Sequence, residues 1–547
     1  MTTDRYHLGA YAAAVSLMAS RLDAEHVTAR LNAHDHTLWS SDPTEISDRL
    51  AWLTLPADIR TEVDDLRRFA DAAHAEGYRH VVLLGMGGSS LGPEVIRQVV
   101  GSSNGDLRAD MFTLDSTVPA WVAATTAAID PACTIFAVSS KSGTTTEPLA
   151  FYAHFRHLVE STVGAENAGR NFIAVTDPGT PLVSLGQNTG FRRAFINDPD
   201  IGGRYSVLSY FGLVPAALMG VDLSRLLDPA ERMQQACTAA GTVSANPGAW
   251  LGTVIGALAA EGRDKLTLVA SPRIAGFGLW VEQLLAESTG KSGAGIIPVA
   301  SEPLGSPEHY GADRFFVQLR LTDDDSEEAL AADRMLEEFK KAGHPVARLE
   351  MSDAYDLGAE FYRWEYATAI AGHILGIHPF DQPDVQGAKD RTVSVLDRYQ
   401  GEGQLPKLHT DEPAALVHLL DQSAAGDYLA VMAYLHDSPG TADAIQELRR
   451  SVMKRYGIAT TAGYGPRFLH STGQLHKGGP NSGIYLQLTQ RHSADVPIPD
   501  WPFSFGVLAD AQALGDIQAL RGLGRRTVSL RLEGDPAAAI RHLTQTL

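Results

Sequence analysis

The alternation of apolar and polar positions predicts a chain in which strands and helices take turns. Short apolar runs rich in β-branched and aromatic residues, each followed by a helical spacing, are typical of buried parallel strands. In the first half of the chain the predicted strands are 80–84, 111–114, 133–138 and 171–175. In the second half they are 266–270, 296–300, 315–321 and 345–350. This alternation indicates an α/β fold built from two doubly wound parallel sheets.

A third, smaller α/β module is expected after about residue 405. Its predicted strands are 427–435, 457–461, 484–489, 503–508 and 527–532, with helices over 442–456 and 510–523. Helical spacing at 11–22 and 46–53 predicts a peripheral helical segment at the N-terminus. We therefore expect four parts: a helical segment (1–60), a first sheet domain (61–240), a second sheet domain (241–400) and a C-terminal α/β module (401–547).

Composition narrows the class of protein. The 547 residues include 45 Lys and Arg against 65 Asp and Glu, a formal charge of 45 − 65 = −20, which argues against nucleic acid or an anionic membrane as the main partner. Two cysteines, Cys133 and Cys237, make no disulfide framework. No basic-then-apolar leader and no apolar run long enough to span a bilayer occurs. We expect a cytoplasmic protein.

The densest candidate chemistry is the hydroxyl loop, residues 139–146, with the sequence SSKSGTTT. It lies between a predicted strand and a helical pattern that Pro148 opens. Free backbone N–H groups, the positive end of the helix dipole and several hydroxyls then meet in one place, which suits the three oxygens of a phosphate. The alternative is an ordinary Ser/Thr-rich capping loop. The density of hydroxyls, with Lys141 among them, favours a phosphate site.

The glycine loop, residues 85–90 (GMGGSS), also follows a predicted strand. It does not match the G-x-G-x-x-G spacing of a dinucleotide site, although Asp115 lies near the distance at which such a site has its acid. We therefore expect no nicotinamide cofactor.

Two predicted helices carry a charged residue on an apolar stripe. Glu287 continues a stripe of the helix over 277–291, and Lys389 lies on a stripe of the helix over 383–396. A charge that faces inward is costly unless it is paired or faces a cavity. The alternative is that each side chain lies near a helix end and reaches solvent.

A long polar stretch, the histidine segment (residues 463–481), interrupts the C-terminal module. It contains two His, an Arg, a Lys and several Gly, and few apolar residues. Loops of this length in compact domains tend to be functional. The alternatives are a flexible surface loop and, with His470, His476 and Lys477, a metal site. No carboxylate or Cys lies close in sequence, so we expect no metal.

Five motifs together resemble the glucose-6-phosphate isomerase family. In chain order they are LLGMGGSSLGPE (83–94), SSKSGTTTEP (139–148), GGRYS (202–206), AESTGK (286–291) and the run from Phe380 to Lys389. The resemblance covers residues 80–390 and implies two sugar-isomerase (SIS) domains. Phe468–Asn481, FLHSTGQLHKGGPN, is similar to the C-terminal part of bifunctional transaldolase/glucose-6-phosphate isomerases. We expect no transaldolase barrel before the isomerase-like part.

The resemblance implies reversible conversion of glucose 6-phosphate to fructose 6-phosphate through a cis-enediol, a step of glycolysis and gluconeogenesis, with no cofactor. It implies a base that moves a proton between C1 and C2, Glu287, and a cation at the reacting carbons, Arg204. It implies contacts to the sugar phosphate from Ser90, Ser140, Lys141, Ser142, Thr145, Glu147 and Gln382, with Lys389 near the phosphate and ring oxygen. It also implies a homodimer with sites at the subunit boundary.

The ring-opening histidine departs from the family pattern. The family has it in a Gln-His run some 30 residues after the base, where this chain has only His309 without a preceding Gln. Gly473–His476 resembles that run better, so we expect His476 in this role, reaching in from the other subunit, with His309 as second choice. Two other interpretations stay open: an isomerase that also takes mannose 6-phosphate, and a sugar-phosphate sensor without catalysis.

Overall fold

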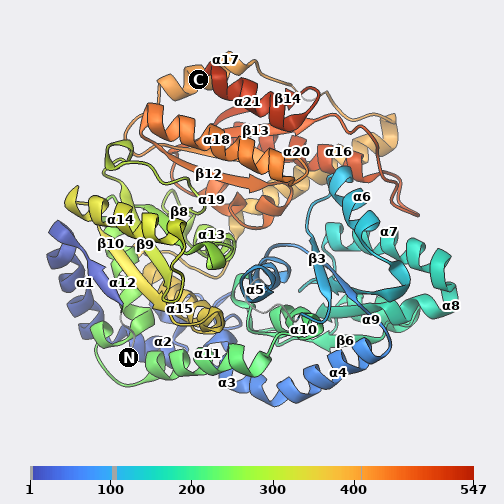
Figure 1. Ribbon diagram of the computed structural model, residues 1–547, viewed down its shortest axis with the longest axis horizontal. Coiled ribbons are helices and arrows are strands. Elements are labelled where there is room, and N and C mark those ends of the chain that lie inside the picture. The colour runs from blue at the N-terminus through green and yellow to red at the C-terminus, as the bar shows by residue number, and fades with distance from the viewer. Residues whose placement is uncertain (1–3, 102–106, 408) are drawn as a thin grey trace.

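The computed structural model describes residues 4–101, 107–407 and 409–547, which form three sheets around a common centre (Figure 1). The first sheet, at the lower right of Figure 1, contains β2 (His80–Gly85), β3 (Asp110–Leu114), β4 (Thr134–Ser139), β5 (Phe172–Thr176) and β6 (Arg193–Ile196). The second contains β1 (Arg5–His7), β7 (Lys265–Ala270), β8 (Ile297–Val299), β9 (Arg314–Leu321) and β10 (Val346–Met351). The third contains β11 (Tyr428–Ala433), β12 (Ala459–Tyr464), β13 (Gly483–Gln490) and β14 (Arg526–Leu532).

All three sheets repeat one strand order. The first runs β3-β2-β4-β5-β6, the second β1-β10-β9-β7-β8 and the third β12-β11-β13-β14. In each, the first strand of the unit lies between the second and the third, and these strands are parallel. Only β1, at the edge of the second sheet, pairs antiparallel among the strands of the described ranges. The connection from β2 therefore runs toward one edge of the sheet and that from β4 toward the other edge. In such sheets ligands bind beyond the carboxyl ends of these two neighbouring strands. The glycine loop follows β2 and the hydroxyl loop follows β4.

Helices connect the strands throughout. Before and within the first sheet they are α1 (Ala12–Ala24), α2 (Val27–Asn32), α3 (Leu55–Asp58), α4 (Val63–Ala75), α5 (Leu91–Gly101), α6 (Pro119–Ala128), α7 (Thr146–Val163), α8 (Ala165–Ala168), α9 (Pro181–Thr189), α10 (Tyr210–Met219) and α11 (Leu223–Thr238). Around the second sheet they are α12 (Pro247–Ala260), α13 (Phe277–Thr289), α14 (Glu327–Lys341) and α15 (Leu357–Leu375). The remainder are α16 (Gln386–Glu402), α17 (Pro413–Asp421), α18 (Pro439–Tyr456), α19 (Gly473–Gly478), α20 (Phe505–Gly522) and α21 (Pro536–Thr546). No helix in the described ranges is both long and apolar enough to cross a membrane.

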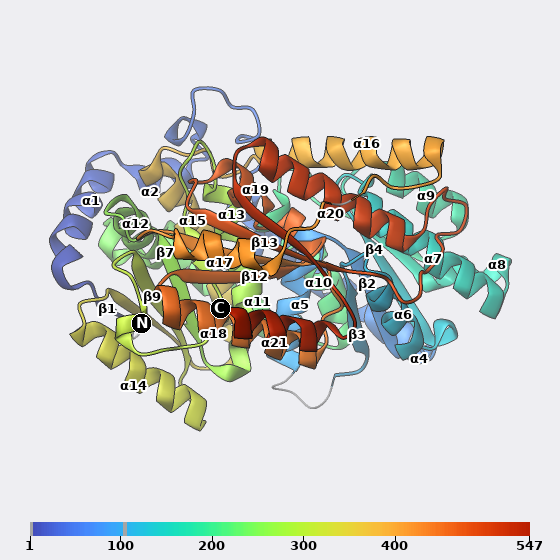
Figure 2. The same ribbon diagram turned by 90° about the horizontal axis from the view of Figure 1, so that it is seen from above.

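The C-terminal module shares a core with the first sheet. Helices α16 and α20 lie side by side in Figure 2, and apolar side chains of both belong to the buried cluster that covers one face of the first sheet. Phe505 of α20 stacks on Phe151 of α7, with ring centroids 5.7 Å apart. The third sheet is therefore not a separate body, because its helix α20 completes the buried cluster that covers the first sheet.

The predicted α/β class is confirmed, and several local predictions are wrong. Residues 503–508 begin α20 rather than a strand, because the Ser504 hydroxyl caps the helix by accepting from the Val507 N–H. Residues 46–53 hold only a short 3₁₀ turn at Ala51–Leu53, not a helix. The histidine segment is not an open loop, since it contains a 3₁₀ turn, η14 (Arg467–His470), and α19. The edge strands β1 and β6 are too short for an apolar pattern to reveal.

Candidate active site

One cavity of about 520 Å³ brings together parts of all three sheet units. The loop after β2 lines it with Met86–Ser89, and the hydroxyl loop lines it with Lys141, Ser142 and Thr145. Helix α13 adds Gln283 and Glu287, and the histidine segment adds 469–471. We call it the central cavity. Its remaining lining residues are Asp177, Pro178, Thr180, Pro199, Gly203, Arg204, Gln382, Val385 and Lys389.

A carboxylate and a guanidinium meet at one end of the central cavity. Arg204 Nη1 lies 3.2 Å from Glu287 Oε1, and the Arg204 side chain is buried. The same guanidinium donates to Ser288 Oγ at 2.9 Å and to Gln382 Oε1 at 3.0 Å. Gln283, one helical turn before Glu287, donates to Glu287 Oε2 at 2.9 Å. Both carboxylate oxygens are therefore oriented, and the cation beside them is held by fixed acceptors.

A buried lysine fixes the loop that presents Gln382. Lys291 Nζ donates to Asp381 Oδ1 at 2.6 Å and to the carbonyl of His378 at 2.5 Å. Burial lowers the pKa of Lys291 to about 7, with repulsion from Arg204 acting in the same direction and attraction to Asp381 against it. The 286–291 motif therefore supplies both the acid in the cavity and a support for the opposite wall.

The hydroxyl loop forms the other end of the cavity. Ser142 and Thr145 line it, and Lys141 Nζ is paired with Asp177 and donates to the Pro199 carbonyl at 2.7 Å. Ser140 does not line the cavity. Its hydroxyl pairs with Thr145 Oγ1 at 2.9 Å and accepts from the Gly143 N–H at 3.1 Å. Ser140 therefore shapes the loop, while its neighbours face the space that the N-terminus of α7 borders.

Glycine is required where three segments meet in the wall of the cavity. A Cβ atom on Gly88 would lie 1.9 Å from the carbonyl oxygen of Gly203. A Cβ atom on Gly87 would lie 2.7 Å from the carbonyl oxygen of His470. The glycine loop thus serves close backbone packing, which brings Arg204 and His470 to the same cavity.

Ser90 is held away from the cavity. Its hydroxyl donates to Asp115 Oδ2 at 3.1 Å, and Asp115 also accepts from Arg467 Nε at 2.8 Å. Burial raises the pKa of Asp115, against the opposing effect of Arg467. The predicted sugar contact from Ser90 does not fit this placement, because Ser89 is the serine of that loop that lines the cavity. Ser90 and Asp115 instead form an anchor for the histidine segment.

The histidine at the cavity is His470. Its Nε2 lies 3.0 Å from Glu147 Oε1, which also accepts from Gln512 Nε2 at 2.6 Å. Burial alone raises the pKa of Glu147, but the charge and hydrogen bond of His470 outweigh it and hold that pKa below its ordinary value. The carbonyl of His470 accepts from Gln283 at 2.9 Å. Helix α20, helix α13 and the start of α7 therefore fix this imidazole together.

Neither predicted ring-opening histidine lies at the cavity. His476 is buried with its ring against Phe468 and Tyr485, and it lines a different cavity. His309 lies in a turn with Ser306 Oγ 3.2 Å from its Nδ1. The physical reason is the helical turn of α19, which directs His476 into the core of the third unit, six residues after the histidine that reaches Glu147. Sequence spacing to Gln474 favours His476, whereas His470 is the histidine that lines the central cavity.

The remaining predicted site residues cluster as expected. Lys389 lines both the central cavity and an adjoining one of about 340 Å³, which Glu147, His470 and Gln512 also line. Gln382 lies beside Arg204. Nothing in the sequence points to Gln283 or Gln512, since a single amide in a helix has no pattern. The hydroxyl loop can hold an anion. Glu287 and Arg204 offer a base beside a cation, and His470 and Glu147 add an imidazole–carboxylate pair.

Comparison with known proteins gives consistent matches. The family model described as phosphoglucose isomerase matches residues 57–295. A glucose-6-phosphate isomerase of Parabacteroides distasonis is 27% identical over 406 residues, covering 66% of this chain and 90% of that protein. One of Symbiobacterium thermophilum is 29% identical over 396 residues, covering 63% and 86%.

Solved structures match the fold. A hypothetical protein of Thermus thermophilus superposes with a TM-score of 0.61 at 23% identity, covering 72% of this chain and all of that one. A glucose-6-phosphate isomerase of Chlamydia trachomatis superposes with a TM-score of 0.59 at 18% identity, covering 75% and 89%. At these identities the structures support the fold alone.

Proposed function

We propose that the chain is a member of the phosphoglucose isomerase family, whose model matches residues 57–295, and that it interconverts glucose 6-phosphate and fructose 6-phosphate. The observation that carries the proposal is the pairing of Glu287 with Arg204 at 3.2 Å in the same cavity that the hydroxyl loop lines. A substrate held by its phosphate then has its C1–C2 end beside one oriented carboxylate.

In the proposed reaction Glu287 removes the C2 proton of the open-chain aldose and returns it to C1. A C–H proton beside a carbonyl is weakly acidic, so negative charge develops on oxygen in the transition state. Arg204 is suited to stabilise that charge because it cannot lose its proton and its other donors are already fixed. Loss of such a donor typically raises the barrier by about 2.7–4 kcal/mol.

Ring opening needs an acid at the ring oxygen and a base at the C1 hydroxyl. We assign His470, in place of His476, as the group that moves the proton in this step, with Lys389 as its partner at the cavity. Glu147 fixes the ring through Nε2, as the acid of a catalytic triad fixes its histidine. Gln512 holds Glu147 in turn and is a positioning residue.

We propose that the phosphate is held by the Ser142 and Thr145 hydroxyls, the N–H groups that open α7, and Lys141. Lys141 is paired with Asp177, so it supplies a shared rather than a free charge. Ser140 supports this loop from behind. The domain limits 61–240 and 241–400 and a cytoplasmic location stay predictions.

We also propose a homodimer, as the family resemblance implies, but one in which neither subunit contributes a catalytic group to the site of the other. His470, Gln512, Glu147 and Glu287 all belong to one chain and are already in contact, directly or through Gln283. The C-terminal module of the same chain therefore supplies the ring-opening histidine, His470, and the other subunit does not.

The test is turnover of fructose 6-phosphate by the purified protein, followed with a glucose-6-phosphate dehydrogenase coupled assay. The wild type should convert the substrate, and Glu287→Gln, which keeps the shape of the side chain, should lower kcat by about 10²- to 10⁴-fold. Far-ultraviolet circular dichroism checks that the variant is folded. A wild type without turnover, or a variant with normal kcat, contradicts the proposal.

A further inference from the structure

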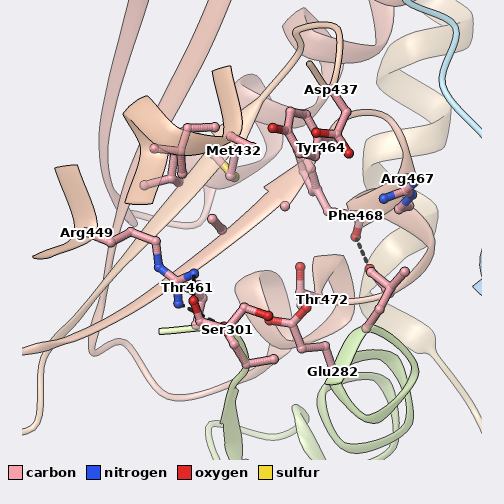
Figure 3. A pocket seen from close by; sticks show the side chains of 18 of the residues that line it. Glu282, Ser301, Met432, Asp437, Arg449, Thr461, Tyr464, Arg467, Phe468 and Thr472 are labelled. Carbon is pink, nitrogen blue, oxygen red and sulfur yellow. Dashed lines mark hydrogen bonds between the residues drawn. The ribbon is translucent and has the colours of Figure 1, made fainter. Parts of the chain in front are cut away.

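A second cavity of about 310 Å³ lies between α13 of the second unit and the β11, β12 and α18 elements of the third. We call it the seam cavity (Figure 3). Its lining includes five hydroxyl side chains, those of Ser301, Thr461, Tyr464, Ser471 and Thr472. In Figure 3 Glu282 extends from α13 toward Thr461 and Arg449, with Asp437 and Tyr464 on the far wall. None of the predicted site residues except His476 lines it.

The cations of the seam cavity are already engaged. Arg449 donates to the carbonyls of Ala300 and Ser301, both at 2.9 Å, and to that of Thr460 at 2.8 Å. Arg467 is paired with Asp115 at 2.8 Å. Arg449 therefore has no donor left for a phosphate or carboxylate ligand, and the charge of Arg467 is shared with Asp115.

The carboxylates and the imidazole of the seam cavity are less fully engaged than its arginines. Among the described residues no ion pair involves Glu282, which reaches the cavity from below, and Asp437 stands at its exposed rim. Burial raises the pKa of Glu282 to about 8, against the opposing effects of Arg449, the Ala300 N–H and Arg467. Buried His476 lines the cavity too, and its Nδ1 has no hydrogen-bond partner among the described residues. A buried polar atom left without a partner is costly, and a bound ligand can satisfy it.

We propose that the seam cavity binds a small organic ammonium ion that also carries hydroxyl groups, an amino sugar being the fitting class. The ammonium group pairs with Glu282, and the hydroxyl groups exchange hydrogen bonds with Ser301, Thr461 and Thr472. An ammonium offsets the cost of a half-buried carboxylate without an ion-pair partner, which a neutral polyol cannot do.

Occupancy of the seam cavity also changes the rate at the central cavity. Helix α13 carries Glu282 into one cavity and Gln283 and Glu287 into the other. Residues 467–472 likewise line both, with Phe468 and Thr472 on one side and His470 on the other. Ser471 lines both cavities, and the Gln283 bond to the His470 carbonyl joins α13 to this segment. The rate effect rests on the proposed isomerase function, whereas the binding does not.

The binding test is calorimetric titration of the full chain with glucosamine, at pH 7.5 and in saturating fructose 6-phosphate to occupy the central cavity. Glucosamine should bind at one site, and glucose, the uncharged control, at least about tenfold more weakly, as expected for loss of a charge-assisted hydrogen bond. Glu282→Gln should weaken glucosamine binding by a similar factor, and Thr472→Val to a smaller degree.

The rate test adds glucosamine at saturation to the coupled assay. The wild-type kcat should change by at least about twofold, and the kcat of Glu282→Gln should not respond. Absence of calorimetric binding, equal binding of glucose, or displacement by the sugar phosphate overturns the site. If Glu282→Gln does not fold, Thr472→Val and the glucose control decide. If the purified chain shows no isomerase activity but still binds glucosamine, the proposed function is refuted and the proposed binding site is not.

Discussion

The hydroxyl loop and the histidine segment face the same cavity, yet they are held in place in opposite ways. The hydroxyl loop is stabilised largely by its own atoms, as in the Ser140–Thr145 pair and the bond from the Gly143 N–H to Ser140, and Lys141 adds contacts within the same sheet unit. The histidine segment is stabilised by remote partners, which are Asp115, Glu147, Gln283, Asp384, Gly290 and Asp516.

This difference separates local from global consequences of mutation. A change in the hydroxyl loop should affect the ligand that the loop binds and little else. A change in a charged anchor of the histidine segment, such as Asp115 or Asp516, should affect stability, because it leaves a buried charge without its partner. The two regions therefore allow binding, catalysis and folding to be perturbed one at a time.

The largest effect is expected from His470→Ala. The variant loses the proposed ring-opening group, so kcat on fructose 6-phosphate should fall by about 10²- to 10⁴-fold. The coupled assay measures it, with His309→Ala as the matched histidine deletion that should stay within about twofold of wild type. Normal activity of His470→Ala with loss of activity in His476→Ala would restore the original assignment.

Breaking an anchor of the histidine segment comes next. Lys477 Nζ lies 2.6 Å from Asp516 Oδ1, and both side chains are buried. Asp516→Ala leaves the ammonium unpaired and should lower the free energy of unfolding by about 3–5 kcal/mol. Urea denaturation measures it.

The matched control is in the other region. Lys141 and Asp177 also form an ion pair, but the Lys141 side chain is 27% exposed. Asp177→Ala should therefore cost no more than about 1 kcal/mol of stability. Equal losses in Asp516→Ala and Asp177→Ala would remove the distinction between the two regions.

A smaller, pH-dependent effect is expected where the regions touch, at Glu147 and His470. The pKa of Glu147 in the folded chain lies below its ordinary 4.5. The unfolded chain then binds more protons in that range, so the stabilisation is present above pH 4.5 and is lost as the pH falls through the folded-state pKa. Unfolding midpoints of Glu147→Gln between pH 3 and 7 should depend less on pH than those of wild type. A parallel pH dependence of the two proteins would refute the linkage.

In the last experiment we expect that mixing two inactive variants restores no activity. If each site is complete in one chain, a co-expressed and co-purified mixture of Glu287→Gln and His470→Ala chains should have only the summed residual activities of the two variants. Sites that exchange a histidine between subunits would regain a large fraction of wild-type activity in the mixture. The wild type assayed at the same total concentration is the reference for both outcomes.

Sequence reasoning succeeded where structure is local. The strands were found because runs such as 134–139 are buried throughout and rich in apolar residues, and the hydroxyl loop because its chemistry is contiguous. Glu287 and Lys389 were found because helical periodicity marks the face on which each side chain lies, and both line the central cavity.

Sequence reasoning failed where contacts between distant residues determine the local structure. His470 and His476 lie in the same segment, and only the contacts with Glu147 on one side and Phe468 and Tyr485 on the other separate their environments. Residues 503–508 carry an apolar run that a strand or a helix could use. The Ser504 cap and the core of the first sheet select the helix.

The stacking of Phe505 on Phe151 has a consequence for biosynthesis. Ribosomes deliver the chain from its N-terminus, and N-terminal domains usually fold first. Here the side of α7 against which Phe505 packs stays uncovered until α20 has been synthesised. We therefore expect the nascent protein to expose this apolar surface to chaperones during most of its synthesis.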